Sequence, residues 1–162
     1  MDDWQRRVDA AWDAADDRGE AATVAAILAL AAERPAGDAA ALYESAGAYD
    51  YAGREAEAEP LYRAALDAGL AEPERSRATI QLASTLRNLD RPEEAVELLR
   101  DLLAAQPAGA PLAGDAHAFA ALALFDLGLK AEALREALTA LAPHASRYGR
   151  AISAYAAELD DA

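Results

Sequence analysis

Apolar residues recur along this chain at helical spacing, and the pattern itself repeats. Four expected turn residues, Gly19, Gly53, Asp90 and Gly128, are separated by 34, 37 and 38 residues. Five positions after each of them stands an aliphatic residue: Val24, Ala58, Ala95 or Ala133. A repeat of this length predicts stacked helix pairs, because one pair cannot bury its apolar face alone. The pattern therefore predicts an all-α fold of four helix pairs.

Turn residues and caps set the expected boundaries of the units. We expect a degenerate helix pair over residues 3–36, then repeats at 38–70, 74–107 and 114–143. Asp38 is the expected cap of the second pair, and Asp90 replaces glycine because aspartate tolerates left-handed backbone. A stripe of Tyr148, Ile152, Tyr155 and Leu159 predicts a capping helix over residues 146–160. We expect residues 1–162 to form a single domain.

With these positions in place, the chain resembles a bacterial branch of the tetratricopeptide repeat family. When Gly53 is the fifteenth position of a unit, the family's small residues fall on Ala46, Ala58 and Ala65, and its large one on Tyr62. The next unit has Ala83, Ala95, Leu102 and Leu99 at the same four places, and Pro107 at the closing proline. The resemblance covers residues 38–143 well and residues 3–36 weakly. It implies a right-handed α-solenoid that binds other proteins.

The resemblance also implies that the first helix of each pair lines a concave groove. Candidate partner contacts on these helices are Tyr43, Tyr51, Arg77, Gln81, Ser84, Arg87, Asn88 and Phe125. Within this set, Arg77, Gln81, Ser84 and Asn88 are spaced along one side of a helix. Arginine side chains suit a carboxylate, so we expect a partner with an acidic or carboxylate group at the third unit. An ordinary solvated helix face is the alternative interpretation.

Composition narrows the classes of ligand. The net charge of −14 repels nucleic acid and anionic membranes, so neither is an expected partner. The chain has no cysteine, and His117 and His144 lack a second ligand at metal spacing, so no metal and no cofactor are expected. The first residues do not resemble a secretory signal, and no apolar run is long enough to span a bilayer. A cytoplasmic location is therefore the expectation.

Together these observations predict a noncatalytic protein-interaction or scaffold module that binds an extended peptide or a partner helix in its groove. One alternative is a small-molecule-binding protein or an enzyme on the same scaffold. No convergent acid and base pair is visible, so an enzyme is not expected. The other alternative is a self-association module that uses the face of Trp4 and Trp12, or the last helix. We expect a monomer or a weak homodimer, with an unidentified protein or peptide as partner.

Overall fold

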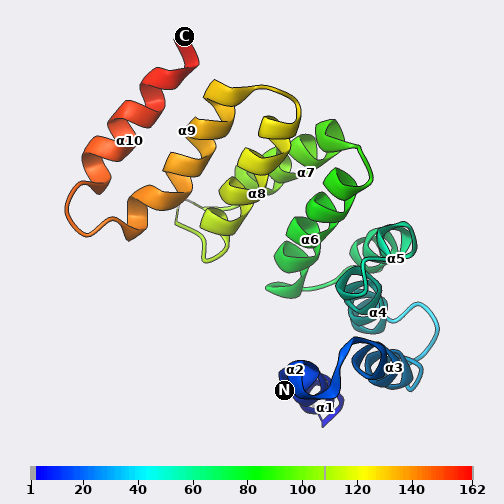
Figure 1. The fold of residues 1–162 in the computed structure, drawn as a ribbon. Coiled ribbons are helices and arrows are strands. Elements are labelled where there is room, and N and C mark those ends of the chain that lie inside the picture. The colour runs from blue at the N-terminus through cyan, green and yellow to red at the C-terminus, as the bar shows by residue number, and fades with distance from the viewer. Residues whose placement is uncertain (1–2, 108, 162) are drawn as a thin grey trace. The chain divides into compact units, whose positions relative to one another are not determined.

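The computed structural model describes residues 3–107 and 109–161, so Met1, Asp2, Ala108 and Ala162 lie outside the described residues. Over those two ranges the chain forms helices joined by turns, without a strand (Figure 1). This confirms the predicted all-α helical-repeat class. The chain divides into two compact units, one up to Thr85 and one from Leu86 onward. The single-domain organisation of residues 1–162 stays a prediction.

The first unit contains the first two helix pairs and most of a further helix. Its helices are α1 (Asp3–Asp13), α2 (Ala15–Arg18), α3 (Glu20–Ala31), α4 (Ala39–Tyr51), α5 (Glu55–Asp67) and the greater part of α6 (Glu74–Asn88). Consecutive elements pack together, α3 against α1 and α4, and α4 against α5. Gly19 and Gly53 turn the chain with φ of 81° and 63°, as the repeat spacing predicts.

Local caps and small side chains explain this packing. Asp38 caps α4 as expected, because its carboxylate accepts a hydrogen bond from the Ala41 N–H at 3.0 Å. Ala58 on α5 is fully buried, and its methyl group allows close helix packing. Trp4 is a core residue whose indole N–H donates to the Leu30 carbonyl at 2.8 Å. The first pair is therefore anchored by a satisfied buried aromatic side chain.

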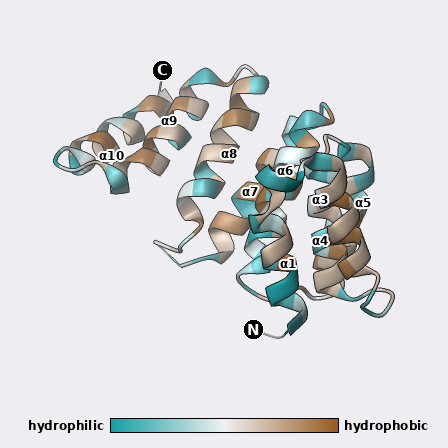
Figure 2. Ribbon diagram, turned by 60° about the horizontal axis from the view of Figure 1, so that its bottom comes forward, coloured by the Kyte–Doolittle hydropathy of each residue, from teal (hydrophilic) through white to brown (hydrophobic). Residues whose placement is uncertain are grey.

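The second unit contains the remaining helices. They are the end of α6, then α7 (Pro92–Ala105), α8 (Ala113–Asp126), α9 (Lys130–Leu141) and α10 (Gly149–Ala157), with short 3-10 turns at Ala142–His144 and Glu158–Asp161. α8 packs against α7 and α9, and α10 packs against α9. Asp90 has φ of 58° and Gly128 has φ of 77°, which confirms both predicted turns. Figure 2 shows the different character of the helices, with strongly hydrophilic residues on α1 and mainly apolar ones on α8.

The last helix differs from the prediction in its start and in its buried face. It begins at Gly149 rather than near residue 146. Of the expected inner stripe, Ile152 and Leu159 are partly buried, but Tyr148 and Tyr155 are 66% and 67% exposed. Ala156, outside that stripe, is buried. The physical reason is close approach: a Cβ on Gly149 would lie 2.4 Å from the carbonyl oxygen of Ala142. Small residues therefore occupy the contact, and the tyrosines point outward.

Among the described residues, no helix combines the length and the apolar character needed to cross a bilayer.

Candidate functional site

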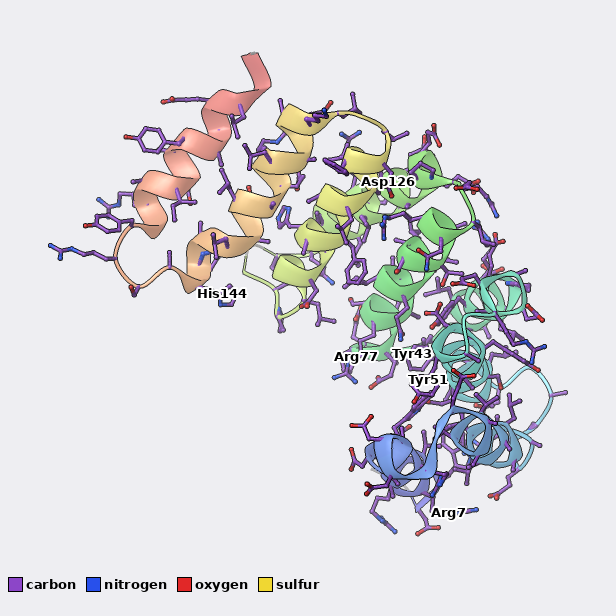
Figure 3. All side chains as sticks on the ribbon, viewed as in Figure 1. Arg7, Tyr43, Tyr51, Arg77, Asp126 and His144 are labelled. Atoms are coloured by element: carbon purple, nitrogen blue, oxygen red, sulfur yellow. The ribbon has the colours of Figure 1, made fainter. Side chains whose placement is uncertain are left out.

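Three helices of the first unit contribute side chains to one small pocket. Each is the first helix of its pair, the kind of helix expected to carry partner contacts. The lining residues are Gln5, Asp9 and Trp12 from α1, Tyr43, Glu44 and Gly47 from α4, and Glu74, Arg77 and Gln81 from α6. Figure 3 shows Tyr43 and Arg77 lying near each other in this region, whereas Arg7 lies apart from them. The pocket has a volume of about 170 Å³.

Glu44 is the most unusual residue of this pocket, because it is a carboxylate that is only 7% exposed. Its Oε2 accepts a hydrogen bond from the indole N–H of Trp12 at 2.7 Å. Burial raises the pKa of Glu44, and the hydrogen bonds from Trp12 and Gln5 lower that pKa only in part. Both donors are neutral, and Glu44 forms no ion pair within residues 3–107 and 109–161. The carboxylate is therefore hydrogen-bonded without a countercharge.

Two aromatic residues, Trp12 and Tyr43, line the pocket together with this carboxylate, and each contacts a further ring. Tyr51 packs edge-on against Trp12, with ring centroids 5.7 Å apart and an interplanar angle of 78°. Tyr43 leans on Tyr62 at a centroid distance of 6.3 Å. Burial raises the pKa of Tyr43 to about 12, so its hydroxyl keeps its proton at neutral pH. The pocket thus presents rigid rings and a neutral phenol beside a buried acid.

Gly47 stands in the middle of α4 and leaves the pocket open. A Cβ at this position would meet Cζ2 of Trp12 at 3.6 Å and the hydroxyl of Tyr62 at 4.0 Å, both ordinary contact distances. Helical backbone does not need glycine, which costs about 1 kcal/mol relative to alanine in a helix interior. Packing therefore does not explain the glycine. The space that it leaves beside Trp12 belongs to the pocket.

The structure brings several of the predicted contact residues together. Tyr43, Arg77 and Gln81 line the pocket, and Tyr51 contacts Trp12, which also lines it. Arg77 is more than half exposed and lies 3.4 Å from Glu74. The Oε1 atom of Gln81 is buried and accepts no hydrogen bond from any described residue. These four candidates therefore lie at or beside one site.

The other four candidates lie outside the pocket. Ser84, in the first unit, is partly exposed but is not among the lining residues. Arg87, Asn88 and Phe125 belong to the second unit. Within that unit the Arg87 guanidinium donates to the carboxylate of Asp126, and Phe125 is 60% exposed. Arg87 already has an intramolecular anion, which weakens the expectation that it binds an acidic partner.

Sequence reasoning missed the acidic half of the pocket. Asp9 is not among the predicted contact residues, yet it lines the pocket, where its Oδ1 accepts a hydrogen bond from Gln5 at 2.9 Å. Trp12, considered from the sequence only as part of a self-association face, is partly buried and also lines the pocket. A signal for Glu44 was present in the sequence: it follows Ala41 by three positions and precedes Ala48 by four, on a stripe that is otherwise apolar and buried.

The acids of this pocket do not form a metal centre. Among the described residues, no group of three or more acidic or histidine side chains could hold one metal ion.

Comparison with known families agrees with the repeat pattern. A family model described as tetratrico peptide repeat matches residues 39–159. No curated protein and no solved structure matches the chain. Because the family model spans most of the chain and the described residues form consecutive packed helices, this protein belongs to the tetratricopeptide repeat family.

Proposed function

We propose that this chain is a noncatalytic module that binds an extended peptide or a helix of a partner protein along the first helices of its repeats. Repeats of this family are generally protein-interaction modules. The observation that carries the proposal is the pocket itself, because α1, α4 and α6 belong to three successive pairs and all contribute to it. Four residues expected to contact a partner lie in it or beside it.

Two features support a protein partner rather than a free metabolite. The pocket, at about 170 Å³, is smaller than the roughly 300–1,000 Å³ that typically encloses a drug-sized ligand. It is large enough to receive one side chain of a longer ligand. Tyr51, 44% exposed beside Trp12, adds aromatic contact area of the kind enriched at protein interfaces. A peptide that extends beyond the pocket would cover this ring.

Some of the earlier expectations stay predictions. An acidic ligand at Arg77 and Arg87 remains untested, although each arginine already lies against a carboxylate, Glu74 and Asp126. Self-association through the tryptophans is disfavoured because Trp4 is buried and Trp12 is hydrogen-bonded to Glu44. The exposed Tyr148 and Tyr155 on the last helix are a better surface for it. Monomer or weak homodimer and a cytoplasmic location also stay predictions.

The experiment is selection of a displayed random-peptide library on the full chain. Selected peptides are then titrated into ¹⁵N-labelled protein. The sequence has two tryptophans, so the indole N–H signal of Trp12 can be assigned and followed as a reporter of the pocket. We expect enriched peptides to shift that signal in a saturable way.

A pair of leucine substitutions makes this test specific. Gly47→Leu fills the pocket, whereas Ala25→Leu adds the same side chain at an exposed position of α3. We expect the first variant to lose peptide binding and the second to keep it. A library that enriches no peptide, or peptides that bind Gly47→Leu with undiminished affinity, would refute the proposed function.

A further inference from the structure

Acidic side chains outnumber basic ones in the lining of the pocket. Asp9, Glu44 and Glu74 contribute carboxylates, and Arg77 is the one basic residue among the lining side chains. That arginine lies 3.4 Å from Glu74, so its ion pair is with a partly exposed acid and not with the buried Glu44. The remaining charge of the pocket is negative. An anionic ligand would meet these acids, whereas a cationic one would be attracted by them.

Hydrogen-bond donors are also in short supply. A carboxylate has about four lone-pair sites, and Glu44 receives hydrogen bonds from the indole of Trp12 and the amide of Gln5. The Oε1 atom of Gln81, in the same lining, has no donor among the described residues. Charged groups in proteins are rarely buried without a counterion, because desolvation favours the neutral form. A ligand group that carries positive charge and several N–H donors would satisfy both of these acceptors.

Two further features of the pocket indicate the shape of the ligand group that it suits. Trp12 and Tyr43 present aromatic rings to the pocket, and aromatic rings attract cations, with tryptophan the strongest. Gly47 keeps space beside Trp12, although alanine would fit there sterically and would favour the helix. An open space lined by aromatic rings and by a buried acid suits the aliphatic stem and planar head of an arginine side chain.

We infer, on the basis of the proposed function, that this pocket receives a cationic side chain of the partner, arginine in preference to lysine, with its charged head at Glu44 and its stem against Trp12 and Tyr43. Arginine is preferred because its guanidinium is planar, stacks on aromatic rings and can donate two parallel hydrogen bonds to a carboxylate. The inferred partner segment is therefore basic, in contrast to the acidic ligand predicted from the arginines of the third unit.

Three small probes of similar shape test the charge preference directly. They are butylguanidinium, its neutral isostere N-butylurea, and pentanoate. Each is titrated into ¹⁵N-labelled full chain while the Trp12 indole N–H signal is followed. We expect a saturable shift with butylguanidinium, at least about tenfold weaker binding of N-butylurea, and no response to pentanoate. Equal binding of the guanidinium and the urea, or preferred binding of pentanoate, would overturn the inference.

Variants of the acids provide the second arm. Glu44→Gln keeps an oxygen that accepts from Trp12 but removes the charge, so the fold should persist while guanidinium affinity falls by about tenfold or more. Asp9→Asn provides an independent loss of pocket charge if Glu44→Gln does not fold. Asp67→Asn, at an exposed position of α5, is the matched control and should bind like the parent chain. Unchanged guanidinium affinity in both pocket variants would contradict the assignment.

The outcomes separate this inference from the proposed function. If library peptides bind at the pocket but carry no enriched arginine or lysine and butylguanidinium is inert, the interaction module stands and the cationic side chain is wrong. If butylguanidinium binds but no peptide is ever enriched, the pocket's charge preference stands and the peptide-binding function fails. Competition between butylguanidinium and a selected peptide would support both the peptide-binding function and the cationic side chain, because it would show that both ligands occupy the same pocket.

Discussion

Replacing Gly47 with alanine should stabilise the protein, and this is the sharpest stability prediction that the structure makes. Gly47 lies inside α4, where its backbone is helical and where the new methyl group would meet Trp12 at 3.6 Å and Tyr62 at 4.0 Å. Neither distance is a clash. The change should therefore give close to the full helix-propensity gain, about 0.8–1.0 kcal/mol in the free energy of unfolding. The new contacts add little, since one carbon–carbon contact contributes about 0.1–0.2 kcal/mol.

A matched substitution has the opposite expected sign. Gly149→Ala places the same methyl group 2.4 Å from the carbonyl oxygen of Ala142, so backbone must move to accommodate it. Overpacking of this kind typically costs about 1–3 kcal/mol. The two variants add the same atoms, which makes their difference a test of local space. For a chain of this length, a change of 1 kcal/mol shifts Tm by roughly 2–4 °C.

Urea and thermal unfolding of both variants provide the assay. Tryptophan fluorescence reports the first unit, because Trp4 and Trp12 both lie there, and circular dichroism at the helical band reports the whole chain. We expect a higher midpoint for Gly47→Ala and a lower one for Gly149→Ala. A destabilised Gly47→Ala variant would mean that the space beside Trp12 is already filled, and the reasoning about the pocket would fail with it.

Two further predictions concern buried positions. Ala95→Leu should lower the free energy of unfolding by about 1–3 kcal/mol, because Ala95 is fully buried on α7. The control Ala104→Leu, at an exposed position of the same helix, should change that free energy little. Equal urea midpoints for the two variants would contradict the packing of α7. Tyr62→Phe should cost about 1–3 kcal/mol at neutral pH, because the Tyr62 hydroxyl donates to Asp50 at 3.2 Å. Burial raises the pKa of Asp50, and the hydrogen bond from Tyr62 lowers that pKa in part, so the hydroxyl stabilises the ionised form of the acid. The difference in unfolding free energy between parent and Tyr62→Phe should therefore become smaller as acidification protonates Asp50. A gap that widens at low pH would refute this.

The turns of the fold could be predicted because a local backbone requirement selects their residues. Gly19, Gly53 and Gly128 all have positive φ, and Asp90 adopts the same conformation as one of the few residue types that tolerate it. Once these turns are placed, helical periodicity decides which residues face inward. Ala58 and Ala95 are buried as the repeat spacing predicts. These requirements act within a few residues along the chain, so a single sequence reveals them.

The last helix shows where this reasoning fails. Two stripes with the same helical spacing are available there, one with Tyr148 and Tyr155 and one with Gly149 and Ala156. Hydrophobicity alone favours the tyrosines. The distance between helices decides otherwise, since Gly149 approaches the carbonyl of Ala142 too closely for a larger side chain. Periodicity identifies possible faces, but only the packing partner selects between them.

The candidate site could be predicted only in part from the sequence, because it too depends on how helices pack together. Tyr43, Arg77 and Gln81 could be listed from the sequence because each occupies an expected groove position on its own helix. Their convergence with α1 could not, because it depends on how three helices far apart in sequence come together. Asp9 illustrates the difficulty: on its own helix it belongs to a polar face, and only the neighbouring α4 and α6 make that face part of a pocket.

Glu44 and Gly47 are both residue types that a buried or interior position of a helix such as α4 disfavours. One is a charge on a buried stripe, and the other is a glycine in a helix interior that does not need it. They are three positions apart, so they lie on the same side of the helix, and both line the pocket. Residues that destabilise the fold are expected to cluster at functional sites, where stability is lost in favour of binding. We therefore expect Gly47→Ala and Glu44→Gln to share a signature: each leaves the fold at least as stable as the parent at neutral pH while weakening the pocket's affinity for a guanidinium.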